Sequence, residues 1–328
     1  MRVTSADVAR ESGVSRTTVS YVLNAKSDVS IPQATRERVR EAASRLGYTP
    51  SAAARTLRTG RSSLVLCVLP NWPIGPVIDT MLDDLASTLG ARGLSVLVHH
   101  GRDSAALAEL WRAVTPRAVV GFTPFSPADE LAMRRAGIQV LGAGLDESPH
   151  HPGVFSVPQA RIGRLQVTHL AQAGHRRIGY ARSVDPRLAE FANLREGGVR
   201  AQCAELGLPE PVVEPVDLEV ASGIAAVRSW RATDPPVTAV AAYNDEVALA
   251  VLAALRAEGL RVPDDVAVIG VDDIPAARLA APALTTVSQA IEAEAEYIAN
   301  AVVAALDGLD APPARAEDIF DVVVRDSV

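Results

Sequence analysis

Three residues near the start of the chain, Arg16, Thr17 and Tyr21, have side chains suited to hydrogen bonding with the edges of DNA bases. They fall on one side of an expected helix, because Val19 and Val22 stand three positions apart and form its buried stripe. A short helix with an arginine and a threonine at its exposed N-terminus is typical of elements that read the major groove. We therefore expect double-stranded DNA as a partner.

This helix is expected to follow a first one across a tight turn. Thr4 can cap the first helix, with Asp7 reaching back as in a capping box, and Gly13 ends it. Ser15 can cap the second helix. The layout is that of a helix-turn-helix. A small helical bundle with no special role also has capped helices joined by a glycine, so these residues alone leave that alternative open.

A third helix is predicted over residues 32–46, with Pro32 in its first turn and Gly47 at its end. Its apolar stripe of valine, alanine and leucine can pack on the first two helices. Three helices in so short a segment make a compact head with a small core.

An alanine-rich segment follows the head and predicts a helix of only two turns, from Ser51 to about Arg58. So short a helix is marginal in water, and we expect it to form when it docks on a partner. Its one bulky apolar residue, Leu57, has arginines on both sides. That composition fits a wedge in the DNA minor groove, although a plain linker helix has the same composition.

Charge is divided unevenly along the chain. Residues 1–62 contain eleven basic and five acidic residues, a net charge of +6, whereas the remaining residues contain twenty-one and thirty-four, a net charge of −13. A basic head on an acidic body confines the attraction for phosphates to the head. The overall charge of −7 conceals this division.

The body alternates apolar runs with amphipathic segments, which predicts α/β architecture with two doubly wound parallel sheets, one in each of two lobes. Ligands of such sheets bind beyond the carboxyl ends of the strands, so the cleft between the lobes is the expected site. The expected strands are 64–69, 95–100, 117–122, 139–145, 177–181, 212–216, 239–243 and 266–271. The expected helices are 76–91, 104–113, 160–173, 244–258 and 290–306.

Residues that directly follow these strands are candidate ligand groups, and they are Trp72, Thr123, Asp146, Asn244 and Asp272. Amides and carboxylates accept hydrogen bonds from vicinal hydroxyls, which suits a sugar or a nucleoside. Asx residues at strand ends are also ordinary helix caps and turn formers. We assign that structural role to Asp245 and Asp273, because each opens a helix or a turn.

Several other function classes find no support in the residues. No apolar run is long enough to span a membrane, and the N-terminus is unlike a signal peptide. The two cysteines are expected to be buried free thiols, and the histidine pairs lack further ligands at metal-binding spacing. No nucleophile elbow, phosphate loop or dinucleotide fingerprint occurs. We expect no catalytic residues, no metal and no cofactor.

The head and the short helix together resemble the lac-repressor (LacI/GalR) family of bacterial transcription regulators. The matching pieces are DVA, GVSRTTVS, VLN, TRERV and LGYTPSAAARTLRTG. The resemblance implies that Arg16, Thr17 and Tyr21 read bases and that Leu57 intercalates from a hinge helix. Tyr21 stands where the family often has arginine, which implies a different base preference there. The DNA-binding residues expected overall are Thr4, Ser15, Arg16, Thr17, Thr18, Tyr21, Asn24, Ala54, Arg55, Leu57 and Arg58.

The body resembles the same family, and thus the periplasmic sugar-binding fold, through LAQAGHRRIGY, LREGGVRA, VTAVAAYNDEVALAVL, GLRVPDDVAVIGVDD and PALTTVSQ. The resemblance implies effector contacts at Arg195, Asn244, Asp272 and Asp146. Residues 75–78 depart from it, because the family has an asparagine, a proline and two phenylalanines there. Trp72 is a candidate substitute for the lost aromatic side chain. Pro158 stands in place of a family aspartate, so an effector other than the usual sugar is an open alternative.

These observations predict a cytoplasmic transcription regulator, a repressor that binds a palindromic operator as a homodimer and responds to a small-molecule effector. The alternatives are a constitutive DNA binder with a non-functional pocket and, less favoured, an enzyme of the cleft. The expected domains are a head (1–50), a hinge helix and linker (51–63) and a body (64–328). Within the body, the expected lobes are about 64–157 plus 290–318 and about 158–285 plus 319–328.

Overall fold

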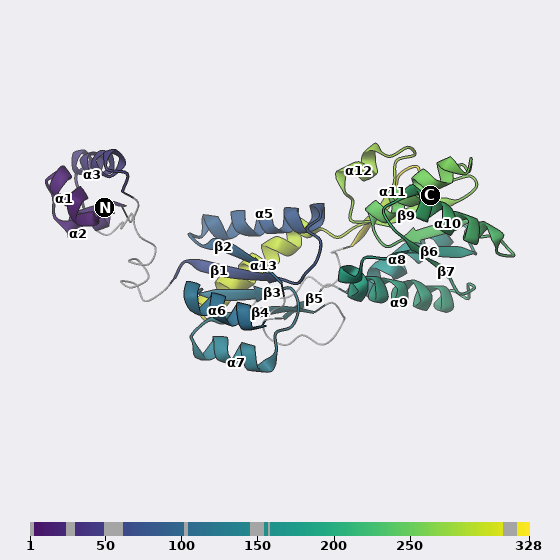
Figure 1. Cartoon of the computed structure of the whole chain (residues 1–328), viewed down its shortest axis with the longest axis horizontal. Helices are drawn as coiled ribbons and strands as arrows, with labels where there is room; N and C mark the ends of the chain where they lie inside the picture. The colour runs from purple at the N-terminus through teal and green to yellow at the C-terminus, as the bar shows by residue number, and fades with distance from the viewer. Residues whose placement is uncertain are drawn as a thin grey trace. The chain divides into compact units, whose positions relative to one another are not determined.

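The computed structural model describes residues 3–23, 30–48, 62–101, 104–144, 154–156, 158–310 and 320–328. The contacts between its residues divide the chain into two compact units, Met1–Ser63 and Leu64–Val328. The described part of the first unit is helical, and the second contains two separate β-sheets with their helices (Figure 1).

The N-terminal unit consists of helices around one small core. The helices are α1 (Ser5–Ser12), α2 (Arg16–Leu23) and α3 (Gln33–Arg45). Val8, Val19 and Val39 lie at the centre of this core, one from each helix, and each is at most 1% exposed. The three predicted helices are therefore present. The third prediction was wrong by one residue at its start, because Pro32 precedes α3 instead of lying in its first turn.

Capping interactions hold the first two helices as the sequence predicts. The Asp7 carboxylate accepts hydrogen bonds from the backbone N–H of Thr4 at 2.9 Å and from its hydroxyl at 2.7 Å. Gly13 ends α1 with a φ of 68°, a conformation that favours glycine. The Ser15 hydroxyl then accepts the backbone N–H of Thr18 at 3.0 Å and so caps α2.

The first sheet of the C-terminal unit is parallel, with strand order β2-β1-β3-β4-β5. Cys67 of β1 shares one core with Leu85 of α5 and Ile298 of α13, whereas Leu66 faces a second core with Trp111 of α6. Strand β1 is thus buried on both faces, which explains its continuous apolar run. The strands are β1 (Leu64–Leu69), β2 (Ser95–His100), β3 (Ala118–Gly121), β4 (Gln139–Gly144) and β5 (Val154–Ser156). The helices are α5 (Pro76–Ala91), α6 (Ser104–Val114), α7 (Pro127–Arg135) and α13 (Ile291–Asp307).

The second sheet has strand order β11-β10-β9-β8-β6-β7 and is parallel except for β11. Helices α8 and α9 pack together on one side of it, and α10 and α11 on the other (Figure 1). The strands are β6 (Ile178–Ser183), β7 (Val212–Val216), β8 (Ala239–Ala242), β9 (Ala267–Val271), β10 (Thr285–Ser288) and β11 (Asp321–Val323). The helices are α8 (Gln159–Gln172), α9 (Ala189–Glu205), α10 (Val220–Ala232), α11 (Asp245–Ala257) and α12 (Pro275–Leu279), with a 3-10 turn at Pro186–Leu188.

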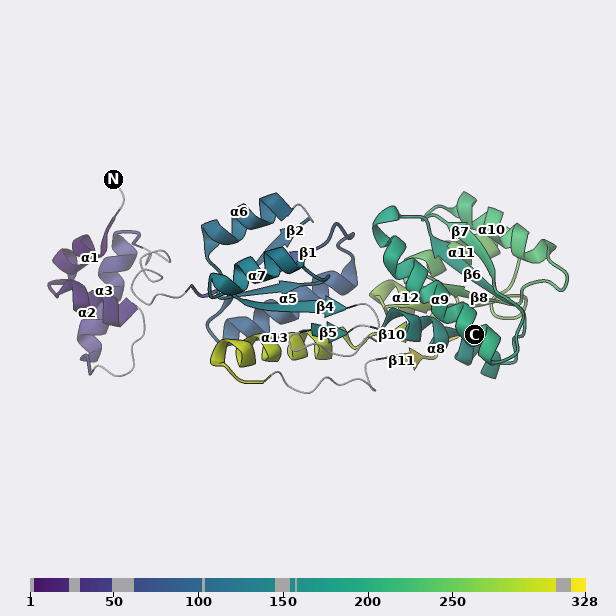
Figure 2. The ribbon, with the colours of Figure 1, turned by 90° about the horizontal axis from the view of Figure 1, so that it is seen from below.

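Segments far apart in sequence complete each half. Helix α13 follows β10 in sequence but packs against α5 of the first sheet, and β11 then belongs to the second sheet (Figure 2). The Ser327 hydroxyl accepts the backbone N–H of Thr285 at 2.8 Å and donates to the carbonyl of Val268 at 2.6 Å. Residues 320–328 are therefore an integral part of the second sheet.

The structure also bears on the two cysteines and on membrane-spanning segments. Cys67 and Cys203 are both buried free cysteines, as predicted. Among the helices that the structure describes, none is both long enough and apolar enough to cross a membrane.

Candidate functional site

The exposed end of α2 presents the residues that the sequence assigns to DNA. Arg16 and Thr17 are exposed, Thr18 and Tyr21 are half-buried, and the opposite face carries the buried Val19. Thr4 and Ser15, the capping residues of α1 and α2, are also exposed. Four of the predicted DNA-binding residues, Ser15 to Thr18, thus lie at the start of α2, while Tyr21 lies further along it and Thr4 precedes α1. Asn24, Ala54, Arg55, Leu57 and Arg58 lie outside the described residues.

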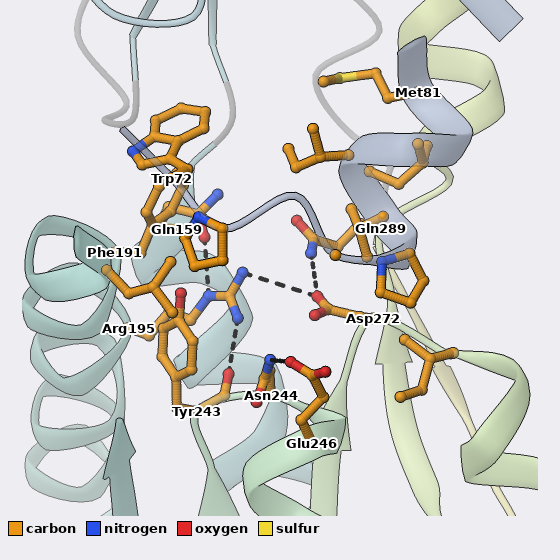
Figure 3. Close-up of a pocket in the computed structure, with 18 of the residues that line it drawn as sticks. Trp72, Met81, Gln159, Phe191, Arg195, Tyr243, Asn244, Glu246, Asp272 and Gln289 are labelled. Carbon is orange, nitrogen blue, oxygen red and sulfur yellow. Dashed lines mark hydrogen bonds and ion pairs between the residues drawn. The ribbon is translucent and has the colours of Figure 1, made fainter. Parts of the chain in front are cut away.

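The C-terminal unit contains a pocket bordered by residues of both sheets, with about 980 Å³ of empty space, part of it open to solvent. This volume suits a small organic molecule. Its apolar lining includes Trp72, Ile78, Met81, Phe122, Phe191 and Ile291. Its polar lining is Gln159, Arg195, Asn244, Glu246, Asp272, Gln289 and Glu294, together with Tyr243 (Figure 3).

Four of the predicted effector residues meet in this pocket: Trp72, Arg195, Asn244 and Asp272. Three of them follow the carboxyl ends of β1, β8 and β9, the place where doubly wound sheets bind ligands. Arg195 comes instead from the middle of α9.

Two predicted effector residues are not found there. Thr123 is not part of the lining, and its placement in the site was wrong. Phe122, which directly precedes it, lines the pocket instead. Asp146 lies outside the described residues.

Arg195 is held in place from several directions (Figure 3). Its Nε donates to Gln159 Oε1 at 2.9 Å, and its Nη1 donates to the carbonyl oxygen of Tyr243 at 2.7 Å. The guanidinium also lies 4.8 Å from the centre of the Tyr243 ring. The side chain is 5% exposed, so these contacts fix a buried charge rather than a mobile surface one.

Asp272 supplies the matching negative charge. Its Oδ1 lies 3.9 Å from Arg195 Nη2 and accepts a hydrogen bond from Gln289 Nε2 at 2.5 Å. The backbone of Asp272 has a φ of 110°, a conformation uncommon for a residue with a side chain. Burial raises the pKa of this carboxyl to about 6, against the opposing effects of Arg195 and Gln289. The group is therefore mostly ionised at neutral pH and oriented from two sides.

Asn244 combines a structural role with a place in the pocket. Its Oδ1 accepts the backbone N–H of Val247 at 3.0 Å and caps α11, while its Nδ2 lies 3.5 Å from Glu246 Oε2. The next residue, Asp245, is fully buried outside the pocket and accepts hydrogen bonds from Ile274 N–H and the Thr286 hydroxyl. Asp245 thus has a structural role as predicted, although Asn244 is the residue that caps α11 and the Asp245 carboxylate bonds to distant residues instead.

Asp273 likewise has the structural role that the sequence predicts. It lies in a turn with a φ of 50°, and its carboxylate pairs with Arg325 and, at 3.2 Å, with Arg278. Asp272 and Asp273 therefore face different partners.

An aromatic pair forms one wall of the pocket. Trp72 and Phe191 meet edge to face, with ring centres 4.6 Å apart and planes inclined by 68°. The carbonyl oxygen of Trp72 lies 2.8 Å from His100 Nε2, which fixes the loop after β1. Sequence reasoning missed Phe191, because it lies in α9, a helix that the apolar pattern did not predict. It also missed Gln159, Gln289 and Glu294, which reach the pocket from α8, the end of β10 and α13.

The lining does not resemble a catalytic centre. None of the described residues that line the pocket is serine, threonine, cysteine, histidine or lysine, so it holds no hydroxyl or thiol nucleophile paired with a histidine or lysine base. Within the part of the chain that the structure describes, no group of three or more histidine, cysteine or acidic residues could hold a metal ion. The arrangement suits reversible binding.

Comparison with known families divides the chain in the same way. Residues 4–51 match the family described as "Bacterial regulatory proteins, lacI family", and residues 167–328 match a "Periplasmic binding protein-like domain". Similar curated proteins include the HTH-type transcriptional regulator CelR of Thermobifida fusca, 32% identical over 99% of this chain and 98% of that protein. Another is the regulator MalR of Streptomyces coelicolor, 31% identical over 98% of this chain and 95% of MalR.

Solved structures show the same architecture. A CelR–cellobiose complex matches with a TM-score of 0.67 at 28% identity, covering 100% of both chains. A lac repressor dimer bound to operator and the anti-inducer ONPF matches with a TM-score of 0.79 at 24% identity, covering 100% of this chain and 99% of the other. The lac repressor likeness, at this identity, shows the fold: a helical N-terminal region followed by a two-sheet body.

Proposed function

Because the chain belongs to the lacI family of bacterial regulatory proteins, we propose that it represses transcription by binding a two-fold symmetric operator as a homodimer. A small molecule bound in the pocket would change its affinity for that operator. Like its relatives, the chain is a DNA-binding transcription regulator and not an enzyme. Since its target is DNA, we place it in the cytoplasm.

The observation that carries this proposal is that one chain joins a lacI-family head, with an exposed helix α2, to a body with a polar and aromatic pocket, over nearly the full length of its regulator relatives. Arg16 and Thr17 are exposed at the start of α2, where a recognition helix contacts base edges. We propose that residues 51–63 link this head to the body and that Ala54, Arg55, Leu57 and Arg58 contact the minor groove.

For the effector we propose a molecule that Asn244, Asp272 and Arg195 orient by hydrogen bonds, with Trp72 and Phe191 packing on its apolar face. Similar proteins support a small organic ligand, since one is a complex with cellobiose and another is named a ribose operon repressor. A sugar or nucleoside-like molecule fits these precedents. The effector must favour one state by about 1–3 kcal/mol to act as a switch.

The experiment starts from the full-length protein and a random library of double-stranded DNA. Sequences selected by binding are expected to contain two inverted half-sites, and their affinity should fall steeply with salt, because Lys and Arg displace counterions from phosphates. The operator is then titrated in the presence of cellobiose, ribose or cytidine. A shifted Kd supports effector control.

Two results would contradict the proposal. Selected sites without inverted symmetry would argue against a dimer reading two half-sites. Operator binding that no small molecule alters, with a pocket that binds none of them, would favour the alternative of a constitutive DNA binder with a non-functional pocket. Chemical conversion of a bound molecule would revive the enzyme alternative.

A further inference from the structure

The charges that line the pocket are unbalanced. Its lining contains three carboxylates, Glu246, Asp272 and Glu294, and one cationic side chain, Arg195. Arg195 directs its donors to Gln159, to the carbonyl of Tyr243 and toward Asp272, so its charge is compensated within the protein. Glu246 and Glu294 therefore have no cationic partner in the described lining.

The second space beside the pocket does not supply a compensating cation. It is lined by Asp272, Asp273 and Glu292 together with one basic residue, Arg278. Arg278 pairs with Asp273 at 3.2 Å, and Arg325 pairs with the other oxygen of the same carboxylate. A ligand that reaches either space therefore encounters acidic groups. The basic residues of the described lining, Arg195 and Arg278, already have partners within the protein.

Glu294 occupies an unusual place on its helix. Ile291, Glu294 and Ile298 follow one another at the spacing of a single face of α13, and Ile298 is fully buried in the core beneath the first sheet. A carboxylate thus stands where the pattern of the helix calls for an apolar residue. By contrast, Glu292 and Glu296 of the same helix are exposed.

No cation or hydrogen-bond donor among the described residues offsets the effect of burial on the Glu294 carboxylate. Burial alone raises its pKa to about 7. An unpaired carboxylate in an apolar wall costs free energy, which a bound positive charge would recover. An anionic ligand would instead add to the repulsion from Glu246 and Glu294.

Another part of the lining is apolar and aromatic. Trp72 and Phe191 form the edge-to-face pair, and Phe122 and Met81 also line the pocket. Aromatic faces attract organic cations as well as apolar surfaces. The acidic groups and the aromatic side chains of the pocket therefore both favour an organic cation.

Resting on the proposed function, we propose that the effector is an organic cation whose protonated amine pairs with Glu294 and whose apolar face packs against Trp72 and Phe191. An aminated ring, a sugar amine or an aromatic amine has this chemistry. Phosphorylated and carboxylated molecules are excluded by the same charges.

The test uses small fluorescence quenchers of different charge as probes of the pocket, with the full-length protein at pH 8.5, where Glu294 is ionised. The probes are the aromatic cation 1-methylnicotinamide, neutral acrylamide and the iodide anion. The chain has three tryptophans, and the signal of Trp72 is the difference between wild type and W72F. We expect the cation to quench Trp72 more strongly than acrylamide, and iodide to quench it least.

The variant E294Q keeps the shape of the side chain and removes its charge. It should lower quenching by the cation by roughly threefold or more, while quenching by acrylamide stays the same. E296Q makes the same change of net charge at an exposed position of the same helix that lines neither space, and it should leave cation quenching unchanged.

Equal quenching by cation and anion in the wild type would overturn the proposal. So would equal effects of E296Q and E294Q, since net charge alone would then explain them. The readout involves no DNA, so its failure leaves the operator proposal standing. Failure of operator binding, in turn, leaves the charge selectivity of the pocket measurable.

Discussion

The backbone of Gly198 in α9 lies directly against the carbonyl oxygen of Ala160 in α8, so that a β-carbon at Gly198 would stand 1.9 Å from that oxygen. Gly163 on α8 makes the reciprocal approach, where a β-carbon would stand 2.2 Å from the carbonyl of Arg195. Two glycines thus allow the helices to touch backbone to backbone. This contact sets the position from which Arg195 enters the pocket.

Gly198→Ala should destabilise the C-terminal unit by about 1–3 kcal/mol, because the new methyl group forces α8 and α9 apart. Urea denaturation measures the change. Gly197→Ala is the matched control: its β-carbon would meet nothing within 4 Å, and alanine is the better helix former, so stability should rise by roughly 0.5–1 kcal/mol. Equal stability of the two variants would show that the close approach is dispensable.

Asp245 makes the stability of the protein depend on pH. Its carboxylate is fully buried beside Thr286, and burial raises its pKa to about 7, above its ordinary value. The folded chain therefore binds an extra proton between about pH 4 and pH 7. The stabilisation that protonated Asp245 contributes is complete at the acidic end of this pH window and disappears as the pH rises through about 7.

Asp245→Asn should remove this component, which amounts to at most about 1.4 kcal/mol per pH unit for one proton. The free energy of unfolding, measured in urea at pH 5 and at pH 8, should differ less in the variant than in the wild type. Asp264→Asn changes an exposed aspartate of the same unit and should leave the difference as it is. An unaltered difference in Asp245→Asn would refute the assignment.

Arg16→Ala should weaken binding to the selected operator by about 1–3 kcal/mol and relax its preference at one base pair of each half-site. Fluorescence anisotropy with operator variants measures both effects. Arg256→Ala removes the same charge from an exposed position on α11 of the body, and its affinity should match that of the wild type. A uniform loss across all sequences for Arg16→Ala would mean a phosphate contact.

Leu57→Ala tests the wedge that the sequence assigns to the hinge. It should weaken specific binding while sparing non-specific binding, because only a deformed operator offers the base step that the leucine parts. Competition between operator and random DNA at one salt concentration gives the ratio. An equal loss of affinity for operator and random DNA would contradict a wedge role for Leu57.

The elements that could be predicted are those whose signals are local. Thr4, Gly13 and Ser15 mark helix ends by their own hydrogen bonds or backbone freedom, so α1 and α2 follow from the sequence. Every predicted strand occurs at nearly its expected place, since buried parallel strands are continuous apolar runs. The elements missed were β5, β10, α7, α9, α10 and α12.

Two of these misses have a clear physical cause. Strand β10 buries Thr285 and Thr286 completely, and Ser327 and Asp245 satisfy their polar atoms from far along the chain. Helix α9 turns Arg195 and Gly198 inward, so it lacks an apolar stripe. Their burial depends on distant partners, which local patterns do not contain.

The pocket residues divide in the same way, into those with a local sequence signal and those without one. Strand ends pointed to Trp72, Asn244 and Asp272, because the topology of parallel sheets gathers such residues at one edge. The other lining residues, among them Phe191 and Glu294, lie on helix faces, and only the packed structure shows which face borders the pocket.

The pairing of β11 with β10 also sets an order for folding during synthesis. Residues 3–48 can form their own core as soon as they leave the ribosome, whereas the second sheet waits for residues 320–328, which complete it at Ser327. Each nascent chain therefore carries a formed DNA-reading head before the half of its body that contains Arg195 and Asp272 is finished. For that interval the head is present without a complete C-terminal unit.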